Sequence, residues 1–240
     1  MTISRQDIQD MVENGLVSDI FRMERAFELL KASGERANEL NDYERGNFGE
    51  LFGAFQTALS TESILAVARI YDEPNKKYPT RCIKGVLNFL VENSNELPTI
   101  REPYQLRLLL EYMNSPKALI ETVASEPQQF ASRFAAFIAS LLGSPVRMVA
   151  LEKLKTVRDK TLAHNEQTSR ISGPTWESLQ DLLEIVKNVV GALGWAYFST
   201  AYVNNGEYIL TEDAHRPANA LNRLLGTLIS QNLDKCNKFS

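Results

Sequence analysis

Apolar residues recur at steps of three and four positions through most of this chain, and this spacing favours a mainly helical fold. The first predicted helix is expected to end at Gly34, and its apolar face is formed by Ile8, Met11, Val12, Leu16, Ile20, Met23, Phe27 and Leu30. A second long helix is predicted over about 48–71, before a loop that contains Pro74 and Pro79. We therefore predict an all-α fold.

Proline and glycine residues divide the middle of the chain into further helices. Shorter helices are predicted over roughly 80–93 and 103–123. Ser125-Glu126-Pro127 has the form of an N-cap followed by a first-turn proline, and Gly143 is expected to end that helix. Ser144-Pro145 predicts the next helix, with candidate core residues Val146, Val149, Ala150, Leu154, Val157 and Leu162.

The last third of the chain shows the same kind of punctuation. Gly173-Pro174-Thr175 predicts the start of a helix whose apolar residues are Leu179, Leu182, Leu183, Val186, Val190 and Leu193. Asn204-Asn205-Gly206 predicts a small hairpin within 202–210, and Asp213 is expected to cap a last helix that reaches about Leu233. We predict an N-terminal helical extension over 1–47, a helical bundle over 48–201 and a C-terminal hairpin and helix over 202–240, packed as one compact unit.

Charge and cysteine content restrict the classes of function. The net charge is −4, so no global basic field attracts nucleic acid, and RNA binding would need a local basic patch. Two cysteines, Cys82 and Cys236, are too few for a disulfide framework and lack metal-ligand spacing. The first fifteen residues contain no signal-peptide core, and the apolar stretch 189–203 is too short to span a bilayer. We predict a buried helix there and a cytoplasmic protein.

The residues that carry the most chemistry are Arg158-Asp159-Lys160-Thr161-Leu162-Ala163-His164. A histidine exchanges protons near neutral pH, and an arginine holds a phosphate with a planar set of donors. Cleavage of RNA needs a proton removed from the 2′-hydroxyl, a proton delivered to the leaving oxygen, and positive charge at the phosphate. His164 could serve as acid or base, Arg158 could hold the phosphoryl oxygens, and Asp159 could orient either side chain.

The spacing of Arg158 and His164 raises a geometric problem. On a regular α-helix, residues six apart are separated by about 120° around the axis and by about 9 Å along it. The two side chains could share one phosphate if the helix loosens near Ala163-His164-Asn165, or if two copies of the helix face each other and pool their side chains.

A structural reading of the same residues is also open. Arg-Asp-Lys beside a helix end is typical of a solvated surface with salt bridges, and a histidine in a last turn can act as a cap. Arg69 and Asp72 could likewise form an ordinary intrahelical pair. Asp213-Ala214-His215-Arg216 is the other titratable cluster, for which we expect a capping role and an exposed His215-Arg216.

The arrangement of Arg158, Asp159 and His164 resembles the signature of the HEPN superfamily. The string VRDKTLAHN, and the upstream run from Ala68 to Asp72 (ARIYD), resemble its AbiU-type branch, named after phage-abortive-infection proteins. The resemblance covers about 48–201. Toxins of this superfamily that are silenced by adenylylation carry a tyrosine two residues after the histidine, whereas this chain has the acidic Glu166. That mode of control is not expected here.

The resemblance implies an up-and-down helical bundle that forms a homodimer, with two copies of the motif in one cleft. Many members are metal-independent ribonucleases of toxin–antitoxin, phage-defence or RNA-processing systems. It implies that Arg158 and His164 form the cleavage pair, with Asp159 as their polar companion. We expect Arg69 and Asp72 to support the site by bracing the motif helix from a neighbouring helix, with a direct role in the cleft as the alternative. The expected partners are RNA and an antitoxin or defence protein, without a membrane, cofactor or metal. The alternative is a non-catalytic helical scaffold that binds RNA or a partner protein, as some members do.

Overall fold

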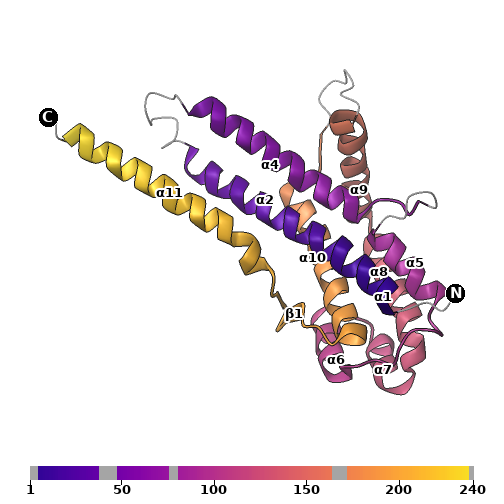
Figure 1. Cartoon of the computed structure of the whole chain (residues 1–240). Coiled ribbons are helices and arrows are strands. Elements are labelled where there is room, and N and C mark those ends of the chain that lie inside the picture. The colour runs from indigo at the N-terminus through magenta and orange to yellow at the C-terminus, as the bar shows by residue number, and fades with distance from the viewer. Residues whose placement is uncertain (1–4, 38–47, 76–80, 164–171, 238–240) are drawn as a thin grey trace. The chain divides into compact units, whose positions relative to one another are not determined.

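The computed structural model describes residues 5–37, 48–75, 81–163 and 172–237, and these residues are mainly helical (Figure 1). The predicted all-α fold is confirmed. The described strands form one short two-stranded hairpin. The helices group into two compact units, of which the first comprises 1–20 and 66–209 and the second comprises 21–65 and 210–240. The division into 1–47, 48–201 and 202–240 stays a prediction.

The first unit contains most of the helices. Their bounds are α1 (Arg5–Met11), the π-helical η1 (Val12–Val17), α5 (Ile83–Glu92), α6 (Pro103–Tyr112), α7 (Lys117–Ser125), the 3₁₀ turn η3 (Pro127–Gln129), α8 (Phe130–Leu142), α9 (Pro145–Val157), the π-helical η4 (Arg158–Ala163), α10 (Trp176–Leu193) and the π-helical η5 (Gly194–Phe198). The core of this unit includes Ile8, Val12, Leu16, Val86, Leu90, Leu106, Leu110, Phe130, Phe134, Ile138, Leu182, Val186, Val190 and Tyr197.

Helix α10 is the central buried helix of the first unit. It begins where Gly173-Pro174-Thr175 predicted a helix start, and the structure shows Thr175 as its N-cap, because the Thr175 hydroxyl accepts a hydrogen bond from the Ser178 backbone N–H at 3.2 Å. The helix continues into η5, and nearly all residues from Val189 to Phe198 are buried. The prediction of a buried helix in this apolar stretch is confirmed. Gly194 permits close packing here, because a Cβ at this position would lie 2.4 Å from the carbonyl oxygen of Thr200.

The segment 103–123 differs from its prediction, since it forms two helices, α6 and α7, instead of one. Asn114 has a φ of 53°, a left-handed conformation that ends α6. Pro116 then precedes α7 and has no N–H to continue the hydrogen-bonding pattern of a helix. The chain therefore turns between Tyr112 and Lys117.

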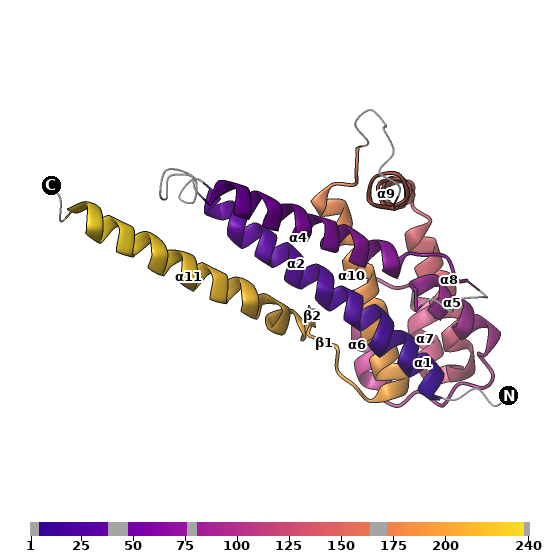
Figure 2. The same ribbon diagram turned by 45° about the horizontal axis from the view of Figure 1, so that its top comes forward.

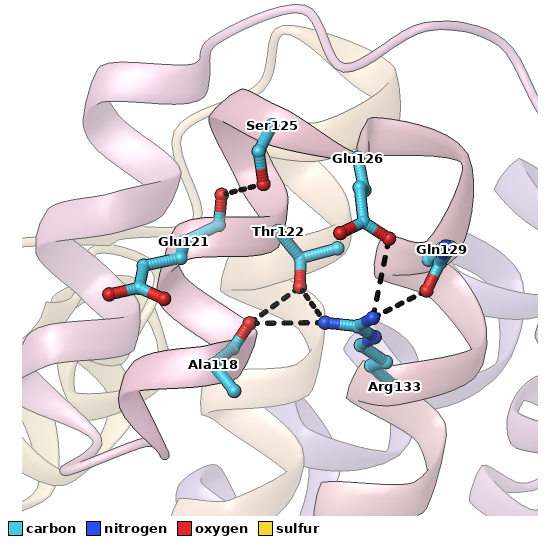
Figure 3. A network of polar contacts seen from close by, with 7 residues as sticks. All are labelled: Ala118, Glu121, Thr122, Ser125, Glu126, Gln129 and Arg133. Carbon is cyan, nitrogen blue, oxygen red and sulfur yellow. Dashed lines mark hydrogen bonds and ion pairs between the residues drawn. The ribbon is translucent and has the colours of Figure 1, made fainter.

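The corner between α7 and α8 also differs from its prediction (Figure 3). Ser125 is the last residue of α7, not an N-cap, and its hydroxyl donates to the Glu121 carbonyl at 2.9 Å. Arg133 of α8 holds the corner, because its guanidinium donates to the Thr122 hydroxyl at 2.9 Å and to the Glu126 carboxylate at 3.3 Å. The same side chain also donates to the Gln129 amide oxygen.

The hairpin within 202–210 is confirmed. Strands β1 (Val203–Asn204) and β2 (Glu207–Tyr208) pair antiparallel, with Val203 opposite Tyr208. The two turn residues, Asn205 and Gly206, have φ values of 50° and 81°. Positive values at both positions are the signature of a type I′ turn, for which Asn-Gly is a preferred sequence.

The second unit consists of long helical segments. It takes Phe21 onward from α2 (Ser18–Glu35), the part of α4 (Gly49–Ile70) up to Leu65, and α11 (Thr211–Asn237). Both views show these parts of α2 and α4 side by side (Figures 1 and 2). The Thr211 hydroxyl of α11 donates to Glu24 of α2 at 2.9 Å.

The start of α11 corrects one prediction. The helix begins at Thr211, two residues before the expected cap Asp213, which lies in the first turn and pairs with Arg216 at 2.7 Å. Arg216 is exposed, as expected, whereas His215 is half-buried, with its Nε2 3.8 Å from the carboxylate of Glu28.

One described helix, α4, is long and apolar enough to cross a membrane by length and composition. Its most apolar window has a mean hydropathy of 1.2, and 22% of that window is buried. The segments 127–142 and 145–160 meet the same test only if they are joined across a bend of 77°. Core helices of soluble proteins also pass this test, and the cytoplasmic location stays a prediction.

Candidate functional site

The predicted motif begins where helix α9 ends. Pro145 starts α9 as predicted, but two of its candidate core residues are exposed: Val146 by 77% and Val149 by 51%. Ala150, Leu154 and Val157 are buried. The face of α9 around Leu154 therefore packs against the rest of the first unit, whereas Val146 and Val149 are exposed to solvent. The side chain of Leu162 lies outside the described residues.

The helix changes from α to π geometry at Arg158, the first residue of the motif. A π turn bonds each residue to the fifth along, so it widens the helix and rotates the residues that follow. Such turns are frequent at functional sites. The turns η1 and η5 are also π-helical, so a π turn alone does not mark a site in this chain. His164 lies outside the described residues, and its approach to Arg158 stays a prediction.

Two carboxylates hold Arg158. Its Nε donates to Asp159 Oδ1 at 2.7 Å, and its Nη1 donates to Asp72 Oδ1 at 2.8 Å. The hydrogen bond to Asp159, with a further contribution from Asp72, raises the pKa of the Arg158 guanidinium above its usual value. The side chain is 27% exposed. Arg158 is therefore a protonated cation in a fixed orientation that still reaches solvent.

Asp72 reaches the motif from the end of α4, 86 residues earlier in the chain. Its Oδ1 also accepts the Glu73 backbone N–H at 2.9 Å. A carboxylate just beyond a helix C-terminus lies at the negative end of the helix dipole, so the nearby guanidinium offsets an unfavourable interaction. Tyr71 fixes this segment, because its hydroxyl donates to the Leu182 carbonyl of α10 at 2.7 Å. Burial raises the pKa of Tyr71, so its hydroxyl stays protonated.

Arg69, the other residue of the upstream run, pairs in a different direction. Its Nε donates to Asp19, at the start of α2, at 2.8 Å. Both residues belong to the first unit. Arg69 and Asp72 are three residues apart, yet each contacts a distant part of the chain. The structure brings Asp72 to Arg158 and joins Arg69 to Asp19.

A second arginine fixes α9 on α10. Arg147 donates to both carboxylate oxygens of Asp181, from Nε at 2.7 Å and from Nη2 at 3.0 Å. Its Nη1 donates to the Leu141 carbonyl at 3.0 Å. No sequence pattern marks this pair, because its members are 34 residues apart and belong to no motif.

An open pocket of about 490 Å³ lies beside Arg158. Its walls come from the end of α4 and the residues just after it, through Ala68, Tyr71 and Asp72, and from α9 and the start of η4, through Lys155 and Arg158. No motif in the sequence marks this pocket, although Leu151, Leu154 and Arg158 follow one another at helical steps of three and four. Among the described residues, no group of three or more His, Cys, Asp or Glu side chains is placed to hold a metal ion.

The comparisons with known proteins identify the family. The family model described as AbiU2, of the HEPN type, matches residues 5–221. This match extends at both ends beyond the 48–201 range on which the resemblance was recognised. No curated protein and no solved structure matches the chain. Because the family model covers most of its length, the chain belongs to the AbiU2 family of HEPN proteins.

Proposed function

We propose that this protein is a metal-independent endoribonuclease that acts as a homodimer in phage defence or a toxin–antitoxin system. The observation that carries the proposal is the state of Arg158: a protonated guanidinium, fixed by two carboxylates, on the wall of an open pocket. Six residues later the chain carries His164, which supplies an exchangeable proton. Membership of the AbiU2 family supports a role in abortive infection.

In the proposed reaction, the 2′-oxygen of RNA attacks the adjacent phosphorus and the bond from phosphorus to the 5′-oxygen breaks. The 2′-hydroxyl loses a proton to a base, and the leaving 5′-oxygen gains one from an acid. His164 fills one of these roles, and His164 of a second copy could fill the other. Arg158 stabilises the charge that develops on the phosphoryl oxygens. Asp159 orients Arg158 through the bond to its Nε.

The substrate phosphate competes with Asp72 for Arg158. The two carboxylates occupy Nε and one N–H of Nη1, so within the described part of the chain three of the five guanidinium N–H groups are left for a ligand. A phosphate can bind to these groups first and then displace Asp72. Asp72 thus has two effects in the proposed enzyme: it orients the guanidinium and it lowers the affinity for the substrate.

A second copy of the chain answers the geometric problem of the motif. An α-helix would separate Arg158 and His164 by about 120° around its axis. Residues 158–163 instead form a π-helical turn, and in the proposed dimer the motif residues of two copies face each other and share one phosphate. Apolar side chains are exposed on the first turns of α9, at Val146, Met148 and Val149. Exposed apolar clusters favour protein contacts, and this one supports a homodimer that involves the motif helix.

The proposal is tested by incubating labelled RNA with the purified protein in EDTA. We expect cleavage by the natural protein, no cleavage by His164→Ala, and full cleavage by His215→Ala, the matched change at the other histidine. Circular dichroism and sedimentation should show the same fold and assembly for all three. Equal cleavage by His164→Ala would exclude the proposed role of this residue, and loss of cleavage only in His215→Ala would point to a different site.

A non-catalytic scaffold is the second candidate, and the charge around Arg158 favours it. The two negative charges of Asp72 and Asp159 outnumber the single positive charge of Arg158, and the net charge of the whole chain is −4. A site of this kind would bind RNA or a partner protein without chemistry. Binding of labelled RNA in EDTA without any cleavage would support this candidate and contradict the nuclease.

A further inference from the structure

The pocket beside Arg158 has the size and composition of a ligand site. Its volume of about 490 Å³ falls within the range of roughly 300–1,000 Å³ that is usual for small-molecule sites. The apolar part of its lining, called here the apolar floor, consists of Ala68, Leu151, Leu154 and the ring of Tyr71. The Tyr71 hydroxyl is already bonded to the Leu182 carbonyl, so the ring can present only its apolar surface.

Lys155 lines the same pocket, one helical turn before Arg158. Residues three apart on a helix are neighbours, with about 5–6 Å between their Cβ atoms. Lys155 is exposed, and within the described part of the chain it forms no ion pair. Its ammonium group can therefore move over the pocket and meet a ligand without breaking an existing bond.

The carboxylates of the pocket are partly neutralised by other cations. Glu73 pairs with Lys84 of α5, and Asp72 is bonded to Arg158. Glu152 is exposed to solvent, where its charge is screened. Lys155 thus adds a second cation to the lining of the pocket, near Arg158, and the same pocket contains the apolar floor.

We propose that this pocket is a subsite for one nucleotide of the RNA substrate. Lys155 binds the phosphate next to the one held by Arg158, and the apolar floor receives the base of that nucleotide. The inference rests on the proposed function, because it assigns part of the substrate to the same site. Lys155 acts as a substrate-positioning residue: it binds the RNA and takes no part in proton transfer.

Lys153 provides a matched control for the test. It is an exposed lysine on the same helix, two residues away, and it does not line the pocket. RNA binding is measured by fluorescence anisotropy over a series of salt concentrations, with His164→Ala in every protein to prevent cleavage. We expect Lys155→Ala to weaken binding several-fold and to reduce the slope of log affinity against log salt by about 0.7, the value for one phosphate contact on single-stranded nucleic acid. Lys153→Ala should change neither quantity.

In proteins that retain His164, Lys155→Ala should raise KM more than it lowers kcat, and Lys155→Arg should restore most of the binding. Equal affinity and salt slope for Lys155→Ala and Lys153→Ala, in a protein that binds RNA, would overturn the subsite and leave the proposed function standing. If the protein neither binds nor cleaves RNA, the proposed function itself fails and the subsite fails with it.

The base-binding part is tested separately with small competitors. Adenosine monophosphate and inorganic phosphate carry the same kind of anion, but only the nucleotide offers a base to the apolar floor. We expect adenosine monophosphate to displace labelled RNA at a lower concentration than phosphate does, and Lys155→Ala to reduce the effect of the nucleotide. Equal displacement by the two competitors would contradict a base on the floor of the pocket.

Discussion

At the scale of the residue, the site depends on how two carboxylates share one guanidinium. Asp159 is the neighbour of Arg158 in sequence, whereas Asp72 comes from the end of another helix. A bond between such distant residues fixes both the side chain and the helix that carries it. In the proposed enzyme, the negative charges of Asp72 and Asp159 also set the electrostatic cost of binding a phosphate at Arg158.

Replacing Asp72 by Asn tests this balance. The amide oxygen can still accept a bond from Arg158, but the negative charge that competes with phosphate is gone. We expect tighter RNA binding and a lower KM, with a loss of unfolding free energy of about 1 kcal/mol or less, as is usual for partly exposed ion pairs. Anisotropy and denaturant unfolding measure the two effects.

Asp10→Asn is the control for this change. Asp10 also pairs with an arginine in the first unit, Arg81, through two hydrogen bonds of 2.7 and 3.2 Å, and it is not part of the pocket. The substitution alters the net charge by the same amount, so any effect of overall charge appears in both variants. Weaker RNA binding by Asp72→Asn would show that Asp72 serves only to position Arg158.

At the scale of the element, α10 and η5 pack closely against the segment that follows them. This packing stabilises the centre of the first unit. Gly194→Ala would place a Cβ 2.4 Å from the Thr200 carbonyl oxygen, so the backbone must shift. We expect a loss of unfolding free energy of about 1–3 kcal/mol, as for other overpacking changes. Thermal and denaturant unfolding of the variant measure this loss.

Gly53→Ala provides the opposite expectation within the same chain. Gly53 lies inside α4, and a Cβ there would meet nothing within 4 Å. Alanine stabilises an exposed helix interior relative to glycine by roughly 0.5–1 kcal/mol. A stabilised Gly194→Ala variant would show that the close approach to Thr200 is not a constraint on the fold.

Local signals predicted several helix boundaries correctly, although Ser125 ends a helix and Asp213 lies inside one, where N-caps were expected. Pro145 starts α9, Thr175 caps α10, Gly143 follows α8, and Asn205-Gly206 forms the hairpin turn, because each depends on backbone chemistry within a few residues. The division of 103–123 was missed, although Asn114-Ser115-Pro116 carries turn residues, because the apolar spacing on both sides suggested one continuous helix.

Burial and long-range contacts were harder to predict. Val146, Val149 and Ala150 all fit the three- and four-residue spacing of a buried helix face. Only the position of the neighbouring helices decides which of them are buried. The bond between Asp72 and Arg158 joins residues 86 positions apart, and no periodic pattern specifies it. The resemblance marked both residues, but their contact, the partner of Arg69 and the pocket emerged only from the fold.

At the scale of the whole molecule, the net charge of −4 means that RNA is not drawn to this protein by a general field. In the proposed enzyme, recognition of RNA depends on a few cations in one place, and Arg158 and Lys155 line one pocket. Shared use of the motif by two copies would double these cations within one cleft. Assembly and catalysis are therefore linked in the proposed enzyme.

The end groups of RNA cleaved in EDTA test the central claim most directly. Attack by the 2′-oxygen without a metal leaves a 2′,3′-cyclic phosphate on one fragment and a 5′-hydroxyl on the other. We predict these ends from the natural protein, and no products from His164→Ala or Arg158→Ala at the same state of assembly. Fragments with 3′-hydroxyl and 5′-phosphate ends, cleavage that stops in EDTA, or unchanged cleavage by either variant would contradict the claim.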